Sequence, residues 1–140
     1  MRNPGYSIIH TIICDDVRRE DNGKEILIGV YNGTMVLDSI PTVLPTFAIR
    51  ILAKVNTREE RKVTGSISGP SGSDIVRFEG SLKVEITKYL SSFSFRAAAL
   101  PINALGRHEV KIGIGSTPKV ISSFDVITRE QMNAGNPQQK

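Results

Sequence analysis

The sequence predicts an all-β protein, an antiparallel β-sandwich of about nine short strands with an immunoglobulin-like end. Apolar residues recur with a period of two in most segments, and turn signals separate these segments at roughly 8–12-residue intervals. No stretch shows a long helical period. We expect a single sandwich domain over residues 1–127. Residues 128–140 are rich in Gln, Asn, Gly and Pro, so we expect a flexible C-terminal tail there.

The first expected element is a hairpin over residues 8–31. Two apolar runs flank a charged centre, and Asn22-Gly23 between them indicates a type I′ turn, which needs φ > 0 at both central residues. The apolar residues of the first strand change parity, because Cys14 follows one alternating face and Ile13 the other. This pattern predicts either a strand buried on both faces or a β-bulge near residues 14–16.

The later elements follow from the same signals. Pro41 and Pro45 indicate a crossing loop or an edge, because proline cannot donate to a ladder. Residues 57–60 read Thr-Arg-Glu-Glu and fit a capping box for one helical turn. Beyond the hairpin strands at 6–17 and 25–31, strands are expected over residues 34–37, 47–55, 62–68, 75–79, 82–86, 93–99, 110–114 and 120–127.

The last two expected strands have an immunoglobulin-like pattern. Gly106-Arg107-His108 precedes an alternating strand, and a turn then leads to Phe124-Asp125-Val126. In immunoglobulin-like domains a tyrosine often lies two residues after the glycine and anchors the corner. In this sequence that position is His108.

The opening hairpin also resembles a known family. The resemblance lies in residues 13–18 (ICDDVR), Gly23-Lys24, residues 27–31 (LIGVY) and Leu44-Pro45. These segments resemble a bacterial family of small uncharacterised proteins known only by a domain-of-unknown-function label. The resemblance is strongest over residues 8–50. It implies a bacterial or phage origin and a compact β fold, and it brings no activity and no catalytic residues.

Composition favours the cytoplasm. Cys14 is the only cysteine, so no intrachain disulfide is possible, which suits a reducing compartment. The apolar run over residues 8–14 is short and ends in Asp15-Asp16, so we expect no signal peptide. No stretch approaches the 18 apolar residues of a membrane-spanning helix.

Residues with catalytic or metal-binding chemistry are few and dispersed. His10 and His108 both fall in expected strands and could meet across the sheets, but two histidines without a third ligand make a weak metal site. Cys14 has no neighbouring His or Lys to activate it, which favours a buried, inert thiol. We therefore expect no enzymatic activity, no cofactor and no metal site.

The charged tip of the opening hairpin is the predicted contact surface. It consists of Asp15, Asp16, Arg18, Arg19 and Lys24. Convergent carboxylates at the end of a β-sandwich can bind calcium, and three more acids lie nearby in this hairpin. Because basic residues lie among the acids and would pair with them, we favour a protein contact over a calcium site.

Nucleic-acid binding is the alternative function. The net charge is +4, and residues 41–140 carry all of the excess positive charge. The candidate basic stripe consists of Arg50, Lys54, Arg58, Arg61 and Lys62. Against this alternative, the chain has no Trp and its Phe residues fall in phase with other apolar residues.

The sequence thus predicts a non-enzymatic β-sandwich that acts through protein–protein contacts with an unknown partner. A basic nucleic-acid-binding module is the alternative, and association of the chain with itself through edge strands stays open.

Overall fold

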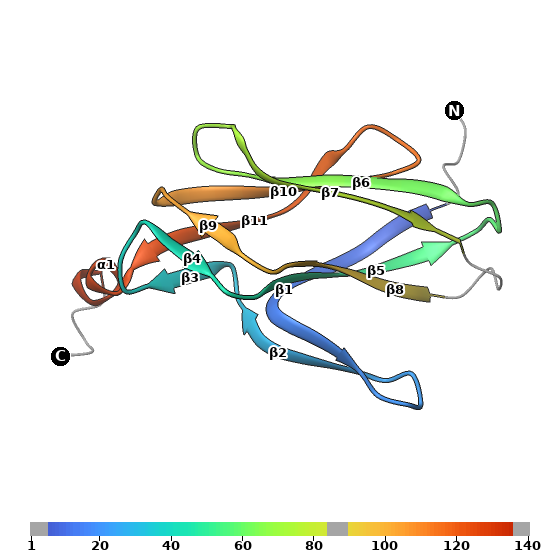
Figure 1. Ribbon diagram of the computed structural model, residues 1–140, viewed down its shortest axis with the longest axis horizontal. Coiled ribbons are helices and arrows are strands. Elements are labelled where there is room, and N and C mark those ends of the chain that lie inside the picture. The colour runs from blue at the N-terminus through green and yellow to red at the C-terminus, as the bar shows by residue number, and fades with distance from the viewer. Residues whose placement is uncertain (1–5, 84–89, 136–140) are drawn as a thin grey trace.

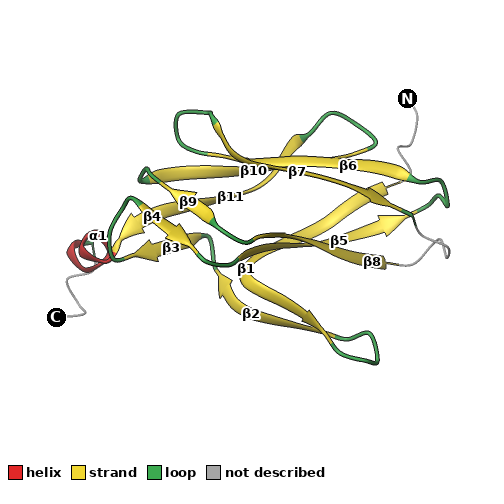
Figure 2. Ribbon diagram, in the orientation of Figure 1, coloured by secondary structure: helices red, strands yellow, loops and turns green. Residues whose placement is uncertain are grey.

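The computed structural model describes residues 6–83 and 90–135 (Figure 1). Eleven strands hold 68% of these described residues, and helix holds 5%. Two main sheets lie one above the other, with a short helix at the C-terminal end (Figure 2). The predicted all-β sandwich is therefore confirmed.

The first sheet contains both strands of the opening hairpin. Its order is β2-β1-β5-β8, and all three pairings are antiparallel. The strands are β1 (Tyr6–Arg19), β2 (Glu25–Tyr31), β5 (Phe47–Val55) and β8 (Leu90–Ala97). Strand β2 is therefore an edge of this sheet, with a hydrogen-bonded neighbour on one side only.

The second sheet has the order β3-β11-β10-β6-β7. Its strands are β3 (Thr34–Leu37), β6 (Arg61–Ser68), β7 (Asp74–Leu82), β10 (Gly106–Ile114) and β11 (Lys119–Thr128). Strand β3 runs parallel to β11, so this sheet is mixed and not purely antiparallel. Strands β10 and β11 form the antiparallel hairpin expected of the last two strands, and the immunoglobulin-like comparison itself stays a prediction.

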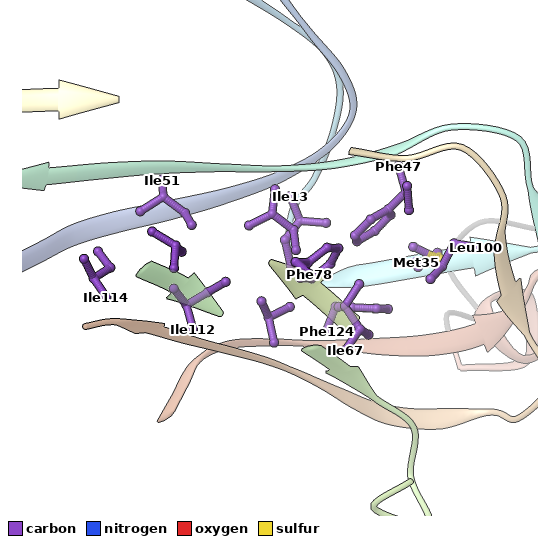
Figure 3. Close-up of a cluster of buried hydrophobic side chains, with 14 of the residues drawn as sticks. Ile13, Met35, Phe47, Ile51, Ile67, Phe78, Leu100, Ile112, Ile114 and Phe124 are labelled. Atoms are coloured by element: carbon purple, nitrogen blue, oxygen red, sulfur yellow. The ribbon is translucent and has the colours of Figure 1, made fainter. Parts of the chain in front are cut away.

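The core fills the space between the two sheets (Figure 3). Strand β5 alternates as predicted, with Ile49 and Ile51 fully buried and Lys54 exposed. From the second sheet, Ile67, Ile112 and Phe124 pack into the same core. Burial of such side chains contributes about 1.5–3 kcal/mol each, so this interface holds the sandwich together.

Strand β1 is buried on both faces, which was one of the two predicted alternatives. Its first part, to Cys14, pairs with β5, and its last part pairs with β2 alone. Ile13 packs into the main core, whereas Cys14 joins a second apolar cluster with Val17 and Ala48 on the outer face of the first sheet. In Figure 1 the chain bends within β1, and the β1–β2 hairpin then lies along the first sheet on the side away from the second.

The irregularities of β1 differ in place from the predicted bulge. The pairing of β1 with β5 shifts at Ile9. Near residues 14–16 the β1–β2 register is kept, but Asp15 and Gly29 pass each other without pairing. Gly29 has φ +67°, a conformation that favours glycine. The face that β1 turns to the core therefore changes at the irregularity at Ile9, so that Ile8 and Ile13 both pack on the main core. A local twist at Asp15 and Gly29 follows it without an inserted residue.

The turn of the opening hairpin is one residue longer than predicted. The Gly23 amide donates to the Glu20 carbonyl, and the Glu20 amide donates to the Lys24 carbonyl. These bonds place Asp21 and Asn22 at the centre of the turn and Gly23, with φ +88°, directly after it. This is the three-residue loop that ends in a left-handed glycine, so the type I′ turn centred on Asn22-Gly23 is wrong.

Two further strands lie where a loop and a stop were expected. Strands β4 (Thr42–Leu44) and β9 (Leu100–Ile102) pair with each other as a separate small sheet. Proline is tolerated at such positions because a two-stranded ladder has two open edges. Strand β7 continues to Leu82, and the rest of the strand predicted over 82–86 lies largely outside the described residues.

The helical turn predicted over residues 57–60 is wrong, and the helix lies at the C-terminal end. Residues 57–60 form no helix, and the Thr57 hydroxyl instead accepts the amide of Glu59 in a local turn. The helix is α1 (Arg129–Ala134), inside the segment predicted to be a tail. Thr128 and Gln131 form its capping box, with side-chain to amide distances of 3.1 and 3.0 Å. Among the described residues, no helix is long and apolar enough to cross a membrane.

Candidate functional site

The β1–β2 hairpin is fixed to the sheet beneath it by a nearly buried ion pair. The Glu25 carboxylate of β2 accepts hydrogen bonds from Arg50 of β5, at 3.0 Å, and from the Ser92 hydroxyl of β8. The side chains of Arg50 and Glu25 are 17% and 12% exposed. Hydrogen bonds to charged groups contribute about 1.5–3 kcal/mol, so this contact links three strands firmly.

The environment of Glu25 favours its ionised form. Burial alone would raise the pKa of this carboxyl. The hydrogen bonds from Ser92 and Arg50, together with the positive charges of Arg50 and Arg19, outweigh burial and hold the pKa below its ordinary value of 4.5. The negative charge of Glu25 is therefore already paired within the fold.

A second contact fixes the other strand of the hairpin. Arg96 of β8 donates to the Val17 carbonyl, and its Nε lies 3.6 Å from the Asp16 carboxylate. The same carboxylate accepts the Val17 amide at 2.9 Å and Arg18 Nε at 3.2 Å. Asp16 is thus bound on both oxygens by groups of the chain itself.

Asp15 is held at the point where β1 twists. The Tyr31 hydroxyl donates to the Asp15 carboxylate at 2.7 Å, and burial followed by this bond raises the pKa of Tyr31. A Cβ atom at Gly29 would lie 2.2 Å from the Asp15 Oδ2 atom. Only glycine at residue 29 therefore leaves room for this carboxylate, which the Tyr31 hydroxyl holds in place.

The outward surface of the hairpin is apolar along β2. Ile26, Ile28 and Val30 are 46%, 42% and 46% exposed, although Leu27 between them packs on the second cluster. We call these three residues the β2 apolar row. Because β2 is an edge strand, the row adjoins backbone N–H and C=O groups that no neighbouring strand pairs within the described part of the chain.

The five residues of the predicted contact surface therefore fall into two groups. Its basic residues Arg18, Arg19 and Lys24 are exposed, as a contact surface requires. Its acids Asp15 and Asp16 are half-buried and bound within the fold. The sequence analysis did not predict the β2 apolar row. The sequence does contain a signal for it, because β2 has apolar residues at both parities and therefore needs a cover on both faces.

The candidate basic stripe is not one surface. Arg50 lies under the hairpin with Glu25, whereas Lys54 and Arg58 are exposed. Arg61 pairs with Glu59 at 2.6 Å, and Lys62 pairs with Glu79 across β6 and β7 in the second sheet. The ion pairs leave few of these cations free for phosphate.

The two histidines lie in different sheets and do not meet. His10 is exposed on β1, and His108 is buried on β10. Cys14 is fully buried, and burial followed by the charge of Asp15 raises the pKa of its thiol. In residues 6–83 and 90–135, no three His, Cys, Asp or Glu side chains are grouped to hold a metal ion.

Comparison with known families finds a match, and it covers the strands described above. The model of a family of unknown function, DUF6941, matches residues 10–127, which include the hairpin, both sheets and all eleven strands in whole or part. No curated protein matches the chain. The chain therefore belongs to the family DUF6941.

Proposed function

We propose that this member of DUF6941 acts without catalysis, by binding another protein at the β1–β2 hairpin. The observation that carries the proposal is the β2 apolar row on an open sheet edge. Proteins usually protect an edge strand with charged side chains, proline or a covering loop, because unpaired strand backbone recruits other strands. A partner segment that adds to β2 would pair this backbone and cover the row.

The hairpin is built to bind without reorganising. Glu25 fixes β2 to β5 and β8, and Arg96 fixes β1 to β8. A surface held in place before binding loses less conformational entropy when a partner docks. These fixed contacts therefore favour a specific binding surface over a flexible hairpin.

The charges beside the row indicate the kind of partner. The carboxylates of Asp15, Asp16 and Glu25 are bound by donors within the chain. Arg19 and Lys24 are exposed and form no ion pair with any residue that the structure describes. An extended partner segment with alternating apolar residues and nearby acidic side chains fits this surface best.

Affinity purification with matched variants tests the proposal. We expect the wild-type chain to retain a protein that survives nuclease treatment and binds again after separate purification. Ile26→Lys with Ile28→Lys should abolish this binding. Val120→Lys, at a residue equally exposed (47%) on the second sheet, should leave it unchanged.

Two outcomes would contradict the hairpin contact. One is a bound protein that the Ile26→Lys, Ile28→Lys variant retains as well as the wild type does. The other is bound material that nuclease releases, which would favour the nucleic-acid alternative and its cations Lys54 and Arg58. Light scattering on the purified chain distinguishes a second copy of the chain as the occupant of β2.

A further inference from the structure

A pocket of about 360 Å³ lies at one end of the second sheet, whereas β2 belongs to the first sheet. It opens between the loop that joins β6 to β7 and the connection from β9 to β10. Pro70, Ile75 and Pro101 give it apolar walls, and Asp74, Asn103 and His108 give it polar groups. Small-molecule sites commonly combine mostly apolar walls with a few convergent polar atoms at about this volume.

His108 is the polar group that the fold leaves unsatisfied. Its side chain is fully buried and its ring stacks on Phe124, with centroids 5.1 Å apart and planes 17° apart. Among the described residues, its Nε2 is the one buried side-chain nitrogen or oxygen without a hydrogen-bond partner. Such a group in a native structure calls for an explanation, because an unpaired buried polar atom destabilises the fold.

The hydrogen bond of the other ring nitrogen sets what Nε2 can do. His108 Nδ1 lies 3.0 Å from the Gly106 carbonyl oxygen. A carbonyl oxygen can only accept, so Nδ1 carries the proton and donates it. The neutral ring then presents a lone pair at Nε2, which accepts a hydrogen bond.

Nε2 is directed toward the pocket wall at Gly69. A Cβ atom at residue 69 would lie 4.0 Å from Nε2, and Gly69 itself lines the pocket. Because this glycine has no side chain, nothing from residue 69 covers the nitrogen. The lone pair is thus on the side from which a molecule in the pocket would approach.

The remaining charge at the pocket selects the ligand. Asp74 supplies a carboxylate, which the Ser68 hydroxyl and Arg77 Nε hold at 3.0 and 3.1 Å. No Lys or Arg lines the pocket in the described part of the chain. A carboxylate and a lone pair both attract hydrogen-bond donors and repel anions.

We infer that this pocket binds a small organic alcohol or amine whose O–H or N–H group donates to His108 Nε2. The apolar body of the ligand packs against Pro70, Ile75 and Pro101. Among the described residues, the lining has no Lys or Arg to pair with an anion, which favours a neutral or cationic ligand over an anionic one. This inference does not depend on the hairpin contact, because the two sites share no residue.

Nuclear magnetic resonance of ¹⁵N-labelled histidine tests the inference on the full chain. The chain has two histidines, and exposed His10 serves as the control within the same spectrum. The probes are benzyl alcohol and benzylamine, with toluene and benzoate as matched compounds that lack a donor. They are added at about pH 8, where an ordinary imidazole is neutral, and up to about 10 mM, which detects millimolar affinity.

The alcohol and the amine should move the Nε2 resonance of His108 and leave both nitrogens of His10 unchanged. Toluene and benzoate should not move it. If none of the four probes moves the Nε2 resonance, the inference is overturned. It is also overturned if benzoate moves this resonance as strongly as benzylamine does.

Two variants locate the contact. Gly69→Ala places a methyl group at ordinary contact distance from Nε2 and from Ile75, so it should fold and weaken binding of benzyl alcohol at least tenfold. His108→Phe keeps a ring against Phe124 and removes the acceptor. It should abolish the response of the Ser71 and Asn103 amides to benzyl alcohol. If that response matches the wild type in both variants, Nε2 does not hold the ligand and the inference fails.

Discussion

The opening and closing hairpins of this protein both contain alternating apolar residues, but they end in opposite environments. Strands β10 and β11 lie inside the five-stranded sheet, between β6 and β3, and their alternate residues fill the core. Strands β1 and β2 also alternate, but β2 has no neighbour beyond it and leaves the β2 apolar row exposed. Alternation thus defines the faces of a strand, and the neighbouring strands decide whether both faces are covered.

The polar contacts of the two hairpins differ in the same way. The closing hairpin is held by strand pairing on both sides of β10 and by apolar packing in the main core. The opening hairpin adds side-chain contacts: Glu25 of β2 binds Arg50 of β5 and Ser92 of β8, and Arg96 of β8 donates to the Val17 carbonyl of β1. A hairpin outside the core needs such contacts, because an isolated two-stranded hairpin is barely stable in water.

The largest expected effect contrasts one isoleucine from each hairpin. Ile112→Ala in β10 should cost about 2–5 kcal/mol, because it opens a cavity at a site that is 3% exposed. Ile28→Ala in β2 should stay within about 0.5 kcal/mol, because this residue is 42% exposed and leaves no closed cavity. Denaturant unfolding measures both. Equal midpoints for the two variants would mean that β2 is covered in solution.

The next effect tests the ion pair beneath the opening hairpin. Glu25→Gln should cost about 1.5–3 kcal/mol, because it leaves the nearly buried Arg50 charge without a charged acceptor. Hydrogen exchange should rise in β2 and stay slow in β10. Glu109→Gln in β10 is the control, and it should change neither region. Uniform loss of protection across both hairpins would show that the opening hairpin does not unfold by itself.

The same carboxylate predicts how acid affects the hairpin. The pKa of Glu25 is lowered in the folded chain, so its contribution is complete above the ordinary value of 4.5. It is lost as the pH falls through the lowered folded pKa, when the carboxylate must be protonated. After correction for the intrinsic pH dependence of amide exchange, protection of the β2 amides should therefore fall with acid in the wild type and stay flat in Glu25→Gln. A parallel acid response in both proteins would assign the effect to other groups.

A smaller effect tests the turn. Gly23→Ala should cost about 1–2 kcal/mol, because φ +88° is strained for a residue with a Cβ even though no atom lies within 4 Å of it. Gly80→Ala in β7 is the matched control, with an ordinary φ and a contact of 3.9 Å to Phe95. Thermal unfolding compares the two. A neutral Gly23→Ala would mean that the turn relaxes without a left-handed residue.

The smallest expected effect is that of calcium. Thermal unfolding in millimolar calcium should match unfolding in chelator, because Asp15, Asp16 and Glu25 are bound by donors of the chain. A ligand at 100 times its dissociation constant would add about 2.7 kcal/mol, which is easily detected. A clear calcium-dependent rise in Tm would make the hairpin tip a cation site.

The sequence by itself determined the fold class and most of the strands. The period of two across β5 and the parity of β2 are local properties, and the bounds of β2, β3 and β5 agree with the prediction. The parity change at Ile13 and Cys14 also predicted a strand covered on both faces. Local signals were less reliable where two similar motifs compete, as Thr57 and Thr128 show for the capping box.

The tertiary structure alone decided which residues form a site. Arg50 and Glu25 are 25 residues apart, and Arg96 and Val17 are 79 apart, so no sequence period relates them. His108 Nε2 has no hydrogen-bond partner among the described residues, although the β6–β7 loop, β7 and β9 all contribute residues to the pocket that His108 lines. Burial and pairing depend on distant strands that pack in three dimensions, and a pattern along one strand carries no record of its neighbours.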